Sequence, residues 1–163
     1  MFPEDIQILA RQVIETAAAR GLTLATAESC TGGLVAGALT GIAGSSAVVE
    51  RGFVTYSNPA KTDLLGVPAR LIETHGAVSE PVARAMAAGA VARSRASVSV
   101  SVTGIAGPGG GTADKPVGLV HFSAVGPDGE IHVEHRFGDI GREQVRLASV
   151  RVALGLLLER ISA

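Results

Sequence analysis

The sequence contains few aromatic residues, few charges and a single cysteine. Aromatic residues make up 3% of the 163 residues, with no tryptophan, and charged residues make up 18%, against about 25% in typical soluble domains. Because Cys30 is the only cysteine, a disulfide framework is excluded. Base stacking on nucleic acid is disfavoured, since aromatic rings are scarce and the formal net charge is −1.

Long apolar runs are also missing, and we expect no N-terminal leader. No apolar run approaches the roughly 20 residues that span a bilayer, and the acidic start at Glu4 and Asp5 shows no secretory signal. Apolar residues nevertheless reach 47%, which is enough to bury one core built from Ala, Val, Leu and Ile. We therefore expect a compact, soluble, cytoplasmic chain with a single domain over residues 1–163 and no membrane contact.

Apolar residues repeat every three to four positions in some segments and every second position in others. The helical period predicts helices at residues 3–19, 34–39, 58–65, 68–74, 79–92 and 142–161. The strand period predicts strands at residues 22–27, 48–56, 98–102, 117–125 and 131–137, the last two forming a hairpin around Pro127-Asp128-Gly129. Strands that alternate with helices indicate an α/β fold, and the hairpin adds antiparallel pairing. We predict a three-layer α/β/α sandwich around a mixed, mostly parallel sheet.

Two glycine-rich turns follow predicted strands and are candidate ligand sites. In residues 28–33, Thr31, Gly32 and Gly33 stand at a helix start, where free amides attract anions. A helix cap with glycines for tight packing explains this turn equally well. Residues 103–111 form the most glycine-dense stretch, at the strand end where α/β folds bind ligands. The alternative is a surface loop that needs positive φ angles, and the length of the run favours the ligand loop.

Three further residues suggest hydrolytic chemistry. Breaking an unreactive amide requires a nucleophile, a base and donors for the oxyanion. Ser46 precedes a predicted strand, Tyr56 ends it, and Lys61 follows in a short helix, so a Ser–Lys arrangement is possible if the lysine is neutral. A capping serine, a half-buried tyrosine and a surface lysine are the simpler explanation, and the residues alone favour it.

The sequence predicts no metal site. His132 and His135 lie three apart in a predicted strand, where such positions point to opposite faces and cannot chelate together. Cys30 stands alone, without a paired histidine that would make it a nucleophile. Arg142 begins the last predicted helix, where an arginine suits an anionic ligand.

Five blocks of residues, taken together, resemble one known family. They cover nearly the whole chain in order: residues 26–33 (TAESCTGG), residues 44–58 with Lys61, residues 76–80 (GAVSE), residues 103–108 (TGIAGP) and residues 115–118 (KPVG). The chain resembles the CinA C-terminal domain family. This family includes bacterial nicotinamide-nucleotide amidohydrolases, which convert nicotinamide mononucleotide (NMN) to nicotinic acid mononucleotide and ammonia in pyridine-nucleotide salvage. Longer members carry an additional N-terminal domain similar to molybdopterin-binding proteins, which we do not expect in these residues.

The resemblance implies a metal-independent Ser–Lys amidase without a cofactor. It suggests Ser46 as the nucleophile, Lys61 as its base, and Tyr56 as the residue that shares the proton and orients Lys61. Ser29 is the rival nucleophile, because it lies in the first motif and can face the same crevice. Physics alone does not choose between the two serines.

The resemblance also implies substrate-binding residues in the two glycine-rich turns. Thr103 and Gly104 are expected to donate to the amide or its oxyanion, with Gly107 in the same loop. The 5′-phosphate is expected at the helix start formed by Thr31, Gly32 and Gly33, with Arg142 as a cation beside it.

Two other hypotheses stay open at this point. One is a non-catalytic nucleotide-binding module linked to competence or the DNA damage response, which would not need Lys61 or Tyr56. The other keeps hydrolysis but acts on a different nucleoside phosphate or amide. The high content of small apolar residues suggests a homo-oligomer, with a small-molecule nucleotide as ligand and no nucleic acid.

Overall fold

The computed structural model describes all 163 residues, as helices and strands joined by turns and by one longer loop at residues 105–118. Left-handed glycines, which have no Cβ to strain, end α1 at Gly21 and α3 at Gly66. The elements in chain order are α1 (Glu4–Arg20), β1 (Leu24–Glu28), α2 (Leu34–Thr40), the 3₁₀ helix η1 (Ser45–Ala47), β2 (Val49–Val54), α3 (Asn58–Leu65), α4 (Ala69–His75), α5 (Glu80–Ala92), β3 (Val98–Gly104), β4 (Leu119–Gly126), β5 (Gly129–Arg136) and α6 (Arg142–Ser162).

The five strands form one mixed sheet in the order β2-β1-β3-β4-β5. The strand β1 is parallel to both β2 and β3, whereas β4 is antiparallel to both β3 and β5. Four strands therefore run in one direction and only β4 is reversed. The predicted hairpin is confirmed, with Pro127 and Asp128 between the paired residues Gly126 and Gly129.

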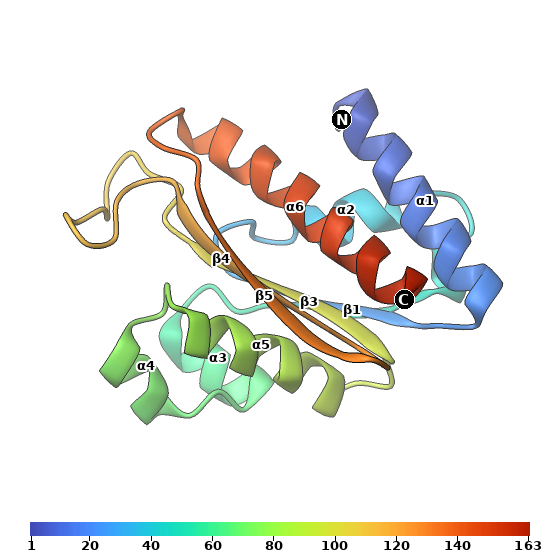
Figure 1. The fold of residues 1–163 in the computed structure, drawn as a ribbon, viewed down its shortest axis with the longest axis horizontal. Helices are drawn as coiled ribbons and strands as arrows, with labels where there is room; N and C mark the ends of the chain where they lie inside the picture. Colours follow the sequence, from blue (N-terminus) through green and yellow to red (C-terminus); the bar gives the residue numbers. More distant parts are fainter.

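Helices cover both faces of the sheet, which confirms the three-layer arrangement (Figure 1). The helices α1, α2 and α6 lie on one face over a core cluster of 26 buried residues, and α3, α4 and α5 lie on the other over a cluster of nine. The alternation along β3 divides its side chains between these layers. Val100 and Val102 belong to the larger cluster, while Ser99 and Ser101 donate hydrogen bonds to backbone carbonyls of α5.

The topology brings three turns to one edge of the sheet. Because β1, β2 and β3 are parallel, their carboxyl ends lie together, and so do the turns at residues 29–33, 55–57 and 105–118 that follow them. The backbone ties two of these ends directly, since the Thr55 amide donates to the Glu28 carbonyl over 2.9 Å. None of the helices is both long and apolar enough to cross a membrane.

Candidate active site

A buried lysine contacts a serine at this edge of the sheet. The Lys61 Nζ donates to the Ser29 Oγ over 3.2 Å and to the Thr55 carbonyl over 2.9 Å, with the Ser57 carbonyl at 3.5 Å. The Lys61 residue is 1% exposed, and no carboxylate lies within ion-pair distance of its amine. Burial therefore lowers the pKa of Lys61 below its ordinary value. A lysine with a lowered pKa beside a hydroxyl is suited to take the proton from that hydroxyl.

The local sequence explains why Lys61 points inward. Ser57 caps α3 by accepting the Ala60 amide over 3.2 Å, and Pro59 suits the first turn because it needs no amide partner. Within α3 only Lys61 and Leu65 are buried, four positions apart on one face.

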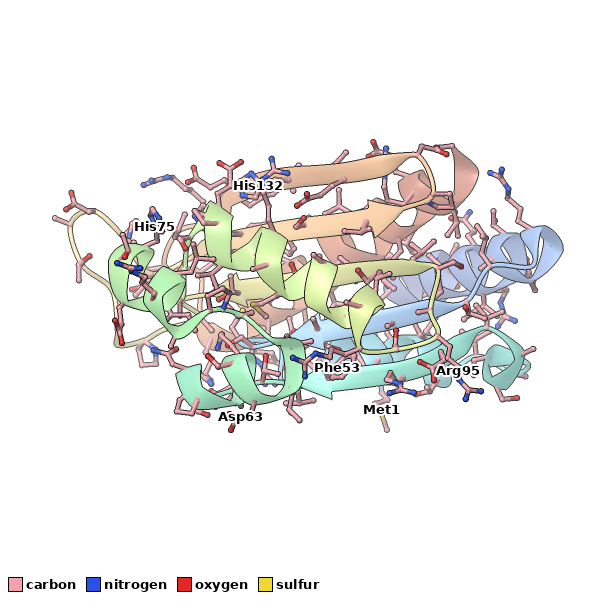
Figure 2. The ribbon with its side chains drawn as sticks, turned by 90° about the horizontal axis from the view of Figure 1, so that it is seen from below. Met1, Phe53, Asp63, His75, Arg95 and His132 are labelled. Carbon is pink, nitrogen blue, oxygen red and sulfur yellow. The ribbon has the colours of Figure 1, made fainter.

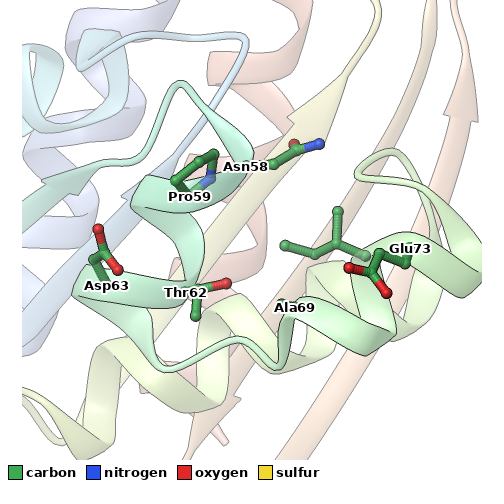
Figure 3. Close-up of a pocket in the computed structure, with 7 residues that line it drawn as sticks. Asn58, Pro59, Thr62, Asp63, Ala69 and Glu73 are labelled. Carbon is green, nitrogen blue, oxygen red and sulfur yellow. The ribbon is translucent and has the colours of Figure 1, made fainter.

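A cavity lies on the other side of the same helix. It measures about 420 Å³ and is lined by Asn58, Pro59, Thr62 and Asp63 of α3 and by Ala69, Ile72 and Glu73 of α4; Figure 3 shows Thr62 and Glu73 on its two sides. Neither Ser29 nor Lys61 lines this cavity. It is therefore separate from the serine–lysine contact.

The start of α2 is occupied by a side chain of the protein itself. The Glu28 carboxylate is fully buried and accepts three backbone amides, from Gly33 over 3.1 Å, Val35 over 3.0 Å and Ala36 over 2.8 Å. These amides are the ones that a phosphate would need at a helix start. The prediction of a phosphate site there is wrong in this respect, because a carboxylate already neutralises the helix end.

Arg146 of α6 holds the turn that follows Ser29. Its Nε donates to the Cys30 carbonyl over 3.1 Å and its Nη2 donates to the Thr31 carbonyl over 3.2 Å. The amides of Cys30 and Thr31 donate no hydrogen bond within the chain, whereas the Ser29 amide donates to the Val102 carbonyl over 2.9 Å. The turn therefore fixes Ser29 and leaves two amides next to it unpaired.

Cys30 is packed into the core beside this turn. It is 7% exposed, and burial raises the pKa of its thiol to about 12. The thiolate form that a cysteine nucleophile requires is therefore strongly disfavoured.

Gly32 and Gly33 have φ angles of 58° and 101°, which explains the glycines of this motif by backbone conformation.

Tyr56 and Arg142 form a second contact at the same edge. The Arg142 guanidinium donates to the Tyr56 hydroxyl over 3.0 Å and to the Gly107 carbonyl over 2.9 Å, so it links the turn after β2 to the glycine-rich loop. Tyr56 is 62% exposed and makes no hydrogen bond with Lys61. The predicted role of Tyr56 in orienting Lys61 is corrected by this geometry, because backbone carbonyls hold the lysine instead.

The loop between β3 and β4 has unpaired amides. The backbone N–H groups of Ala106, Gly107, Gly109, Gly110 and Gly111 donate no hydrogen bond within the chain. Such a row of free donors beside an arginine suits an anionic group. The glycine density of the segment predicted a ligand loop, and free amides are what such a loop requires.

Thr103 and Gly104, which were predicted to donate to the amide or its oxyanion, make contacts within the fold instead. Thr103 is 1% exposed and its hydroxyl donates to the Ala77 carbonyl over 2.8 Å, so its proton is not available to a substrate. Gly104 pairs with Val120 in the sheet, and a Cβ there would come within 2.6 Å of the Val120 side chain. Both positions join the β3 end to its neighbours.

Ser46 and Lys61 lie at opposite ends of β2. Ser46 is exposed in η1, which precedes β2, whereas Lys61 lies in α3, which follows β2. The six residues of β2 span roughly 17 Å at about 3.3 Å per residue, so the two side chains do not meet within one chain. The prediction that Ser46 pairs with Lys61 is therefore wrong, and Ser29 is the serine that the fold brings to the lysine.

Three histidines lie in β4 and β5 and form no hydrogen bond with Ser29 or Lys61. The His132 ring contacts the His121 ring, with 2.9 Å between nitrogens, while the His135 ring stacks on Phe137. His132 and His135 therefore face opposite sides of β5, as strand geometry requires. The residues contain no group of three or more metal-ligating side chains arranged to hold an ion.

Several functional contacts were not predicted from the sequence. Glu28, Arg146 and the carbonyl of Thr55 all hold the serine–lysine pair in place, and none of them was predicted to contact it. The one available signal was Glu28, since a carboxylate that ends a strand of small and apolar residues is expected to have a buried hydrogen-bond partner.

Comparison with known proteins identifies the same family by a family profile and by individual relatives. The profile of the CinA C-terminal domain matches residues 6–161. A CinA-like protein from Mycolicibacterium gilvum is 54% identical over 162 residues, and one from Synechococcus is 53% identical over 157 residues; these cover 99% and 96% of the chain. The chain spans only 38% of the length of either relative.

Solved structures match over the full fold. The competence/damage inducible protein CihA from Agrobacterium tumefaciens has a TM-score of 0.97 and 58% identity, covering 100% of this chain and 99% of that one. A competence-damaged protein (CinA) superfamily protein from Escherichia coli has a TM-score of 0.91 and 37% identity, covering 98% and 92%.

Proposed function

The chain belongs to the CinA C-terminal domain family, and we propose that it hydrolyses the carboxamide of nicotinamide mononucleotide to nicotinic acid mononucleotide and ammonia. The substrate class rests on the family resemblance. The observation that carries the hydrolytic chemistry is the contact between the buried Lys61 amine and the Ser29 hydroxyl.

In the proposed mechanism, Ser29 is the nucleophile and Lys61 is the general base. Neutral Lys61 accepts the proton of the Ser29 hydroxyl as its oxygen attacks the carboxamide carbon, which gives a tetrahedral oxyanion. The C–N bond then breaks, and the lysine returns its proton to the leaving nitrogen, so that ammonia departs. A water molecule, deprotonated by the same amine, attacks the resulting ester and releases the acid with Ser29 regenerated.

The turn after Ser29 supplies donors for the oxyanion in this proposal. The unpaired amides of Cys30 and Thr31 follow the nucleophile directly, as the amides of an oxyanion hole do in other hydrolases. Arg146 fixes the peptide group of the Thr31 amide by binding the Cys30 carbonyl. The Cys30 amide shares its peptide group with the Ser29 carbonyl, which accepts the Gly32 amide over 2.9 Å. This arrangement favours the developing negative charge without any movement during the reaction.

The phosphate of the nucleotide fits the second contact at this edge better than the start of α2. Arg142 provides a cation and Tyr56 a hydroxyl, and the amides of residues 106–111 lie in the loop that Arg142 joins. Arg142 keeps the phosphate-binding role predicted for it, whereas the glycines after Thr31 do not.

Ammonia release from NMN by the EDTA-treated protein tests this function. We expect turnover to be lost in Ser29→Ala and Lys61→Arg, because arginine does not give up its proton, and to be retained in Ser46→Ala as the matched serine control. Each variant is also titrated with NMN while its melting temperature is recorded, so that binding is separated from chemistry.

Two results would contradict the proposal. Full activity in Ser29→Ala with loss in Ser46→Ala would transfer the nucleophile to the other edge of the sheet. Absence of turnover in the unmodified protein, with NMN still raising the melting temperature, would favour the non-catalytic nucleotide-binding module.

A further inference from the structure

The strand β5 leaves one side of the sheet open. It is the last strand in the sheet order and pairs only with β4, and Figure 2 shows it as the outer strand on the side opposite β2. An open edge carries unpaired amides and carbonyls, which can pair with another strand. The strand β5 has eight residues and is, together with β4, the longest strand of the chain.

The register shows which groups of β5 point outward. The Phe137 amide donates to the Gly118 carbonyl just beyond the strand, so odd-numbered residues pair with β4. In an antiparallel pair these bonds alternate along the strand, so the backbone groups of the even-numbered residues face away from the sheet. No other segment of the chain donates to or accepts from them. The outward residues are Glu130, His132, Glu134 and Arg136.

The side chains of these outward residues all lie on the α5 face. Glu130 contacts Arg84 of α5, and His132 lies 3.6 Å from Glu80 of the same helix. The odd-numbered Ile131 packs on the opposite face, against the larger core cluster. Arg136 is exposed, and its only charged neighbour is Glu134, two positions away in the same strand.

The strand is complementary to itself when it is turned around on Val133. In an antiparallel pair of two copies centred on this residue, Glu130 of each copy lies opposite Arg136 of the other. Moving the centre by one residue in either direction places glutamates opposite each other: Glu130 against Glu134, or Glu134 against itself. Like charges directly opposite are destabilising in a sheet, so the charge pattern favours the register centred on Val133 over both adjacent registers.

We propose that two copies of this chain associate through their β5 strands, antiparallel and centred on Val133, to form one continuous ten-stranded sheet. The pairing is isologous, because each strand presents the same groups to the other. Every outward residue of one copy then exchanges backbone hydrogen bonds with one of the other, and Val133 meets Val133 on the face of the larger core. This inference does not rest on the proposed hydrolytic function.

Charge exchange between two variants tests the pairing. Sedimentation equilibrium is measured on the unmodified protein, on Glu130→Arg, on Arg136→Glu and on an equimolar mixture of the two variants. We expect a dimer for the unmodified protein and a dissociation constant raised about tenfold or more for each variant alone, since both symmetric pairs become repulsive. The mixture should dimerise again with nearly the original affinity, because every reversed charge then faces one of opposite sign.

The control is Asp128→Arg, which makes the same change of charge in the adjacent turn but outside the paired residues. It should leave the dissociation constant unchanged, and the melting temperatures of all variants show that they fold. An unmodified protein that stays monomeric overturns the proposal. So does a dimer that tolerates both single reversals, or a mixture that gains no affinity over the separate variants.

Discussion

Replacing Glu28 by glutamine should destabilise the protein strongly, although the two side chains have nearly the same shape. The carboxylate accepts three amides of α2, and a glutamine offers a single oxygen while its NH2 group faces the third amide. The loss of one hydrogen bond to a charged acceptor lowers the free energy of unfolding by about 1.5–3 kcal/mol. The loss of the anion at the helix end lowers it by about another 0.5–1 kcal/mol. The free energy of unfolding should therefore fall by about 2–4 kcal/mol.

Thermal unfolding followed by circular dichroism measures this change. For a chain of this size, about 2–4 °C per kcal/mol predicts that the melting temperature falls by roughly 4–16 °C. Glu15→Gln in α1 is the matched control, since Glu15 is exposed and makes no hydrogen bond through its side chain, and it should change the melting temperature little. If Glu28→Gln melts together with Glu15→Gln, the carboxylate does not hold the start of α2 and the reasoning fails.

Three further outcomes are expected. In the proposed reaction only neutral Lys61 is active, so kcat/KM for NMN should rise about tenfold per pH unit and level off below pH 10.5; a flat profile contradicts this. Arg146→Ala should lower kcat about 100-fold or more with little change in NMN binding, and an unchanged kcat would remove Arg146 from the mechanism. Burial lowers the pKa of His121 and His132, so the unfolded chain binds more protons than the folded one. The free energy of unfolding, measured by urea titration at several pH values, should therefore decrease as pH falls below about 6.5, and it should decrease less steeply in His132→Gln. The same dependence on pH in both proteins would contradict this.

Most of the fold could be predicted because it depends on local patterns. The alternation of Val98, Val100 and Val102 with serines identifies β3, and the glycines after α1 and α3 mark their ends. The positions of the predicted elements agree with the structure to within a few residues. Sheet order and the position of the reversed strand depend on long-range contacts, and the hairpin alone pointed to the antiparallel part.

The candidate site was predicted less well because its contacts join distant residues. Lys61 and Ser29 are 32 positions apart, and only the parallel pairing of β1 with β2 shows that the turn after each strand lies at the same edge. Ser46 is closer to Lys61 in sequence, yet β2 separates them by its whole length. Proximity along the chain therefore suggested a serine that does not contact Lys61.

The two glycine-rich turns resemble each other in sequence but differ in what faces their amides. At the first turn the Glu28 carboxylate is held by three amides of α2, which keeps its charge away from Lys61. A carboxylate paired with that lysine would raise the pKa of the amine and keep it protonated, whereas the two backbone carbonyls around it leave burial as the largest influence. The second turn has no such carboxylate and keeps its amides free beside Arg142. The placement of one acidic side chain thus closes the start of α2 to an external anion and, in the proposed mechanism, allows the neighbouring lysine to act as a base.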